Sequence, residues 1–135
     1  RFPAAEVSVV EKSAEVIQWY KKYFRQRFST HDSQVTFIRE DVRSELVNKF
    51  DIIVLDVDNG PEPISCGSNK WLYSSQGLGQ ISEALLPAGF CLVWSGFESD
   101  EFMKRASVNG FQVSKNAVPI PKTEHMHWIY TLATT

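Results

Sequence analysis

The chain has little cysteine and no recognisable metal-binding pattern. Only two of its 135 residues are cysteines, Cys66 and Cys91, and they form neither a CxxC pair nor a Cys/His spacing typical of zinc sites. His125 and His127 do not change this, because we expect them at ordinary loop or edge positions near the last strand and not as a metal pair. The sequence therefore predicts neither a disulfide framework nor a metal site.

The chain also lacks a positive charge excess and a long apolar run. Its formal net charge of −2 provides no basic field for nucleic acid and no polybasic patch for an anionic membrane. No apolar stretch approaches the roughly 20 residues that a membrane-spanning helix needs, and no signal peptide is recognisable. We therefore expect a cytoplasmic protein that binds neither nucleic acid nor a membrane.

What is present suits one folded domain. The residues are 43% hydrophobic and 22% charged, as in ordinary globular proteins, and a chain of this length buries a real core. We found no repeat, low-complexity tract or linker, so we expect residues 1–135 to form a single domain. Because the chain begins with Arg1 rather than Met, we expect this domain to be incomplete at its N-terminus.

Short apolar runs alternate with helical patterns along the chain. Strands are predicted at residues 7–10, 35–38, 51–56, 90–94, 111–118 and 126–132, and helices at residues 13–28, 42–48, 74–86 and 99–109. Strand 51–56 has only apolar residues between its two terminal aspartates, as expected when helices cover both faces of a parallel sheet. The order of elements predicts an α/β fold with a mostly parallel sheet and a C-terminal antiparallel strand pair.

Three of the predicted strands are followed by an acidic residue, namely Glu11, Asp41 and Asp56. Doubly wound α/β folds bind their ligands beyond the carboxyl ends of the strands, where an acid accepts hydrogen bonds from ribose hydroxyls. An acid after the next strand can accept a hydrogen bond from an adenine amino group. An acid after the strand that follows lies beside the reacting end of the ligand. Three such acids favour a nucleoside site over an ordinary solvated rim.

Four segments carry a more specific pattern. They are FDIIVLDVDNGP at 50–61, VVEKSAEVI at 9–17, LYSSQGL at 72–78 and LLPAGF at 85–90. These segments resemble the motifs YDVIIVDSSDPxGP, VEIDPxVI, LYTxEFY and LKPGG of spermidine synthases, a branch of the Rossmann-like S-adenosylmethionine-dependent methyltransferase superfamily. The resemblance runs in register over nearly the whole chain. It implies a Rossmann-like, methyltransferase-type three-layer sandwich in which the first strand is absent.

The resemblance also implies a role for each site residue. Glu11 would bind the ribose, and Asp41 the adenine, of S-adenosylmethionine or its decarboxylated form. Asp56 would be the catalytic acid that orients and deprotonates an attacking amine, and Asp58 and Tyr73 would contact that substrate. The implied activity is the transfer of an aminopropyl or methyl group to a small amine.

Two departures from the family keep a second interpretation open. Asn59 stands where spermidine synthases have a second acid, and the sequence has no glycine-rich βα unit ahead of Glu11. Either upstream sequence is missing, or the protein is a shortened relative of the family. A shortened relative would expose two unpaired strand edges, and we then expect a homodimer. It would be a non-catalytic remnant that binds no cofactor.

Overall fold

The computed structural model describes residues 5–24, 35–57, 60–61 and 67–134. The chain divides into two compact units, Arg1–Leu46 and Val47–Thr135, and each unit is described by itself. The single domain expected over residues 1–135 stays a prediction. No helix in the described ranges is long and apolar enough to cross a membrane.

The first unit is a pair of parallel strands with short helical segments. Its elements are β1 (Val7–Val10), α1 (Ala14–Trp19), the π-helical turn η1 (Tyr20–Phe24), β2 (Val35–Ile38) and α3 (Val42–Glu45). The Ser13 hydroxyl caps α1 as predicted, accepting a hydrogen bond from the Val16 N–H at 3.3 Å. The rings of Tyr20 and Phe37 lie 4.6 Å apart between centroids and join η1 to β2. The predicted end of the helix near Phe28 lies outside the described residues.

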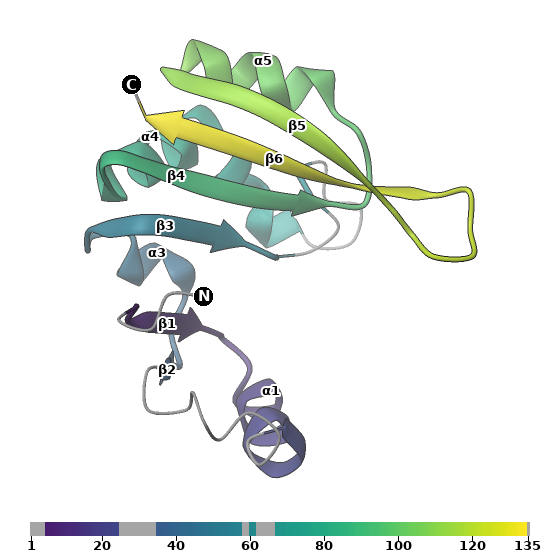
Figure 1. Cartoon of the computed structure of the whole chain (residues 1–135). Coiled ribbons are helices and arrows are strands. Elements are labelled where there is room, and N and C mark those ends of the chain that lie inside the picture. The colour runs from purple at the N-terminus through teal and green to yellow at the C-terminus, as the bar shows by residue number, and fades with distance from the viewer. Residues whose placement is uncertain (1–4, 25–34, 58–59, 62–66, 135) are drawn as a thin grey trace. The chain divides into compact units, whose positions relative to one another are not determined.

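The second unit is a four-stranded sheet with helices between its strands (Figure 1). Its elements are β3 (Phe50–Leu55), the 3₁₀ segment η3 (Gly67–Tyr73), α4 (Ser75–Ala84), β4 (Leu85–Ser95), α5 (Asp100–Val108), β5 (Phe111–Pro119) and β6 (Met126–Thr134). The strand order is β3-β4-β6-β5, with β3 and β4 parallel and β6 antiparallel to both of its neighbours. This arrangement confirms the predicted α/β fold with a C-terminal antiparallel pair.

The core of the second unit lies between one face of the sheet and the helices α4 and α5, which Figure 1 shows behind the strands. The buried side chains alternate along the strands and meet apolar side chains of both helices; they are Ile53, Leu55, Cys91, Val93, Tyr130, Leu132, Leu78, Ile81, Phe102 and Ala106. Burial raises the pKa of the Cys91 thiol to about 12, so this thiol stays protonated at neutral pH. Cys91 thus acts as a small apolar core residue.

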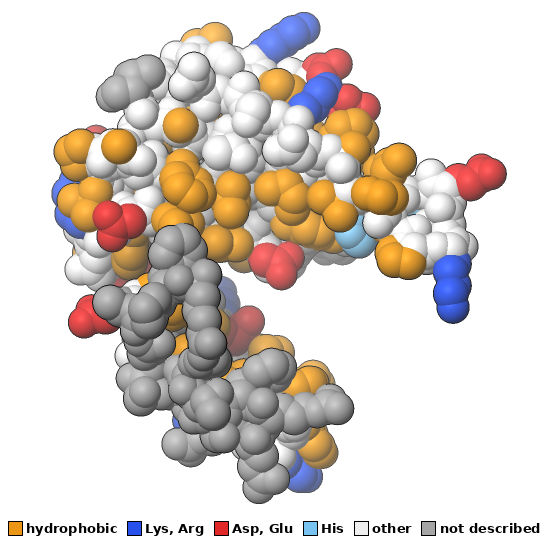
Figure 2. Space-filling view, in the orientation of Figure 1, with side chains coloured by type: hydrophobic (Ala, Val, Ile, Leu, Met, Phe, Trp, Pro, Cys, Tyr) orange, Lys and Arg blue, Asp and Glu red, His pale blue; other side chains and the backbone are white. Residues whose placement is uncertain are grey.

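The opposite face of this sheet is apolar and open within the described chain. Ile52 is 43% exposed and Val54 64% exposed, and Figure 2 shows hydrophobic side chains gathered across the face turned to the viewer. The burial pattern places α4 and α5 on the other side of the sheet, so helices of the second unit cover one face of strand 51–56, and cover on the opposite face stays a prediction. Within the described residues β3 pairs only with β4, so one edge of β3 has no strand partner.

The start of β4 also differs from the prediction, which ended a helix at Leu86 and began the strand at Phe90. The strand already pairs with β3 at Leu85, and its register then shifts through a bulge in which Ala88 has a φ of 62°. A Cβ at Gly89 would lie 2.8 Å from the Leu86 carbonyl oxygen and 2.9 Å from that of Asp51. Only glycine fits this close approach, so the turn expected between helix and strand is built into the strand as a bulge.

Phe102 allows a test of this core. Its ring is fully buried and meets Tyr73 and Tyr130 edge to face, at centroid distances of 5.9 and 5.3 Å. We expect Phe102→Ala to lower the free energy of unfolding by about 3–5 kcal/mol in urea denaturation, because it removes apolar contacts and leaves a cavity. Val108→Ala, at a site that is 87% exposed, should stay within about 0.5 kcal/mol of the wild type. Equal losses in the two variants would contradict this description of the core.

Candidate functional site

Glu11 and Asp41 follow the two parallel strands of the first unit and lie at the same end of their sheet. The Glu11 N–H donates to the Ile38 carbonyl at 3.0 Å and extends the pairing, while its carboxylate accepts from the Ser13 N–H at 2.6 Å. Asp41 caps α3 by accepting from the Arg43 N–H at 3.1 Å. Lys12 joins the two strand ends through an exposed ion pair with Asp41 at 3.7 Å. The structure therefore brings together the two acids assigned to ribose and adenine.

Asp56 follows β3 directly and is exposed. It makes no hydrogen bond or ion pair with any other described residue, in contrast to Glu11 and Asp41. The next residue, Val57, is fixed, because its carbonyl accepts a hydrogen bond from the Tyr73 hydroxyl at 3.1 Å. Tyr73 itself is only 1% exposed and packs on Phe102. Its hydroxyl therefore supports the backbone beside Asp56, and its predicted contact with a substrate stays a prediction.

The loop that follows Asp56 packs against the end of β4. Gly60 has a φ of 115°, and a Cβ at this position would lie 2.1 Å from the Ser95 Oγ. Glycine is needed here for both reasons, the backbone conformation and the contact. Asp58 and Asn59 lie outside the described residues, so the predicted substrate contact of Asp58 stays a prediction. The ends of the parallel strands β3 and β4 thus carry two loops that touch each other.

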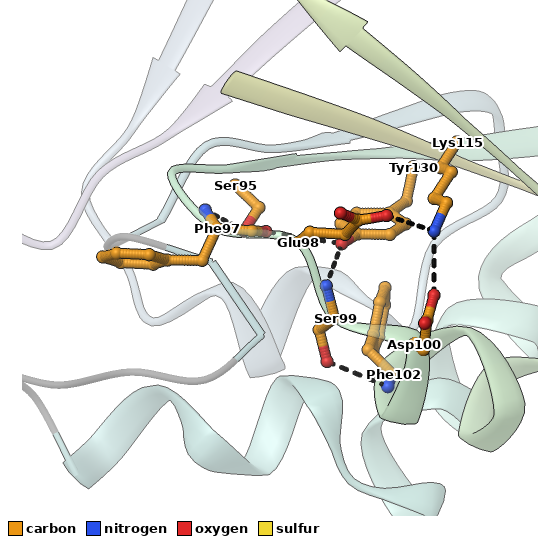
Figure 3. Close-up of polar contacts among 8 residues, drawn as sticks. All are labelled: Ser95, Phe97, Glu98, Ser99, Asp100, Phe102, Lys115 and Tyr130. Atoms are coloured by element: carbon orange, nitrogen blue, oxygen red, sulfur yellow. Dashed lines mark hydrogen bonds and ion pairs between the residues drawn. The ribbon is translucent and has the colours of Figure 1, made fainter. Parts of the chain in front are cut away.

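The turn after β4 is held from inside by Ser95 and Tyr130 (Figure 3). The Ser95 hydroxyl donates to the Phe97 carbonyl at 2.6 Å and accepts from the Phe97 N–H at 3.1 Å. The Tyr130 hydroxyl donates to the same carbonyl at 3.3 Å and accepts from the Ser99 N–H at 2.6 Å. Burial raises the pKa of Tyr130, so its hydroxyl keeps the proton that it donates.

A lysine holds the outer side of the same turn. Lys115 on β5 lies directly opposite Tyr130 and donates to the Glu98 carboxylate and, at 2.8 Å, to that of Asp100 (Figure 3). Its ammonium also lies 5.6 Å from the centre of the Trp128 ring. The hydrogen bond from Lys115 lowers the pKa of Asp100, and the two carboxylates raise the pKa of Lys115. Both acids of the turn are therefore paired with the same lysine, whereas Asp56 has no such partner among the described residues.

The two histidines considered for a metal site lie in different surroundings. The His127 ring packs against Trp94 on the sheet, with 4.8 Å between ring centroids, and His125 is exposed in the loop between β5 and β6. In the part of the chain that the structure describes, no group of three His, Cys, Asp or Glu side chains is arranged to hold a metal ion.

Sequence reasoning found the acids but missed the residues that shape the turn after β4. Ser95 ends β4, Phe97 lies in the turn after it, and Lys115 and Tyr130 lie in the middle of β5 and β6, so these residues meet only in the folded chain. The usable signals were weak. Ser99 was recognisable as a helix cap, and the spacing of Tyr130 and Leu132 places both on the buried face of a strand.

Comparison with known proteins gives the fold but no close relative. No protein-family model and no curated protein matches the sequence. Among solved structures, human methyltransferase-like protein 13 in complex with SAH superposes with a TM-score of 0.74 at 17% identity, over 99% of this chain and 63% of that one.

Two further structures give the same result. Precorrin-6y C5,15-methyltransferase from Geobacter metallireducens has a TM-score of 0.68 at 14% identity, over 98% of this chain and 69% of that one. A probable spermidine synthase from Corynebacterium glutamicum has a TM-score of 0.68 at 17% identity, over 99% of this chain and 49% of that one. The chain therefore has a Rossmann-like methyltransferase fold and spans between half and about two thirds of these neighbours.

The Lys115 cluster predicts a pH-dependent stability. A carboxylate whose pKa is lower in the folded state stabilises that state above its unfolded pKa, and this contribution is lost as the pH falls. We expect the free energy of unfolding to decrease from about pH 5 to about pH 2.5, and to decrease less in Asp100→Asn than in the wild type. Denaturant titrations across this range measure both slopes. Glu124→Gln, an exposed carboxylate in the β5–β6 loop, should keep the wild-type slope. If Asp100→Asn shows the wild-type slope as well, the cluster does not stabilise the turn.

Proposed function

We propose that this chain is a transferase-type domain that binds S-adenosylmethionine or its decarboxylated form and alkylates a small amine. The proposal is supported by Glu11 and Asp41 at the carboxyl ends of the parallel strands of the first unit and, in the second unit, by Asp56 at the carboxyl end of β3. The fold is shared with methyltransferases and spermidine synthases, and doubly wound folds bind nucleotides beyond the carboxyl ends of their strands.

The chemistry of the acids fits an adenosyl group. A carboxylate has about four acceptor positions, so the single hydrogen bond from Ser13 leaves Glu11 able to accept from two ribose hydroxyls. Asp41 is more engaged, because Arg43 and Lys12 contact its two oxygens. It nevertheless retains acceptor capacity for an adenine amino group. Both roles need exposed or half-buried oxygen atoms at a strand end, and both residues meet this condition.

In the proposed reaction a bound cofactor would supply an electrophilic carbon beside its sulfonium, so that the nitrogen–carbon bond would form as the carbon–sulfur bond breaks and a neutral thioether would leave. Asp56 accepts a hydrogen bond from the amine and so orients the nitrogen lone pair, and its carboxylate takes up the proton that the nitrogen loses. Exposure of Asp56 lets that proton pass on to water. The Tyr73 hydroxyl fixes the Val57 carbonyl and thereby holds the backbone that carries this acid. A cationic substrate is attracted by the exposed carboxylate of Asp56.

Calorimetric titration with methylthioadenosine tests the cofactor part of the proposal. We expect binding to the wild-type chain, and about tenfold weaker binding to Glu11→Gln and Asp41→Asn, because each loses a hydrogen bond to a charged acceptor. These substitutions keep an oxygen for the Ser13 contact and for the α3 cap. Glu6→Gln, an exposed change just before β1, should bind as the wild type does. A wild-type chain that does not bind methylthioadenosine would overturn the proposal.

A second candidate function, a non-catalytic oligomerising domain, is favoured by the unpaired edge of β3. The exposed Ile52 and Val54 lie on this strand, and apolar edge strands associate readily. In this case we expect a homodimer in light scattering, and a monomer when Ile52 and Val54 are both replaced by Lys. Val108→Lys, a matched charge on the exposed end of α5, should leave the dimer intact. A monomeric wild-type chain that binds methylthioadenosine would exclude this candidate.

A further inference from the structure

Phe97 combines an exposed ring with a fixed backbone. It lies two residues beyond the end of β4, and 48% of its surface is exposed. Its N–H and its carbonyl are nevertheless both hydrogen-bonded, to Ser95 and to Tyr130. A large apolar side chain in a surface turn usually gains little from such precise support. An aromatic ring on a pre-organised backbone, in contrast, suits ligand contact, because less conformational entropy is lost on binding.

The support of Phe97 reaches back to Asp56 through the core. The Tyr130 ring packs edge to face on Phe102, which packs edge to face on Tyr73, and the Tyr73 hydroxyl holds the carbonyl of Val57. All three rings are fully or almost fully buried. One rigid aromatic row therefore fixes both the turn that carries Phe97 and the backbone next to Asp56.

The strand register places these two residues at the same edge of the sheet. Leu55 of β3 pairs with Val93 of β4, and the strands are parallel, so Asp56 and the turn after Ser95 both follow the carboxyl ends of neighbouring strands. Gly60, in the loop after Asp56, packs directly on Ser95. The loop that bears the acid and the turn that bears the ring are thus in contact.

Building on the transferase function above, we propose that Phe97 is a contact residue for the acceptor and Tyr130 its positioning residue, and that the acceptor is an amine with an attached hydrocarbon or aromatic group. The ring of Phe97 offers an apolar wall for that group, and its face attracts an ammonium. Asp56 supplies the opposite charge. Glu98 and Asp100 are both already engaged by the Lys115 ammonium, whereas Asp56 has no described ion-pair partner.

Calorimetric titration of the full chain with phenethylamine tests this assignment, with and without methylthioadenosine. Phe97→Ala should bind phenethylamine about fivefold or more weakly, since it loses the ring face, and Phe97→Leu should recover only part of the affinity. Asp56→Asn should also bind it more weakly. Phenethyl alcohol, which lacks the charge, should bind the wild type less well than phenethylamine does. Val108→Ala serves as the control and should bind as the wild type does.

Tyr130→Phe separates positioning from packing, because it keeps the ring stacked on Phe102 and removes only the hydroxyl. We expect faster amide exchange at Ser99, whose N–H loses its partner, and weaker binding of phenethylamine. The affinity for methylthioadenosine should stay unchanged in Tyr130→Phe and in Phe97→Ala. A thermal unfolding curve for each variant shows whether the fold persists.

The two proposals fail in different ways. If phenethylamine does not bind the wild type, or binds Phe97→Ala equally well, the role of Phe97 is overturned even where methylthioadenosine binds. If methylthioadenosine does not bind while phenethylamine binds in a Phe97-dependent manner, the transferase function is overturned and the amine site remains.

Discussion

The hydroxyl of Tyr130 joins the core of the second unit to the turn that follows β4. It holds the Phe97 carbonyl and the Ser99 N–H, the latter at the start of α5. The first of these contacts is part-buried and the second is buried, and the loss of a hydrogen bond is costly in such places. Because the Tyr130 ring is itself fixed by Phe102, the position of the turn depends on how the aromatic core packs.

The same aromatic core also positions the backbone next to Asp56, at the end of β3 in this unit. The Tyr73 hydroxyl donates a hydrogen bond to the Val57 carbonyl, and Gly60 allows the following loop to pack closely on Ser95. Asp56 directly precedes Val57 and carries an exposed carboxylate without a partner among the described residues. An exposed carboxylate beside a supported backbone suits the cationic ligand that we propose. This arrangement links the packing of buried aromatic rings to the chemistry that we propose for the surface.

The sequence allowed most of the local structure to be predicted, because strands and helices leave periodic patterns and caps leave single-residue signals. The caps at Ser13 and Ser99 and the acids at strand ends follow from neighbouring residues alone. The bulge at Ala88 and the exposure of Val54 did not follow, since they depend on which elements cover the sheet. The Tyr130 contacts join residues more than 30 positions apart, and no local pattern encodes them.

The most direct test of the central claim, that the strand-end acids bind an adenosyl group, is a crystal structure of the chain soaked with methylthioadenosine. We expect the ribose hydroxyls within hydrogen-bonding distance of the Glu11 carboxylate and the adenine amino group near Asp41, beyond the carboxyl ends of β1 and β2. Ligand density elsewhere on the protein, or none at saturating concentration, would contradict the account.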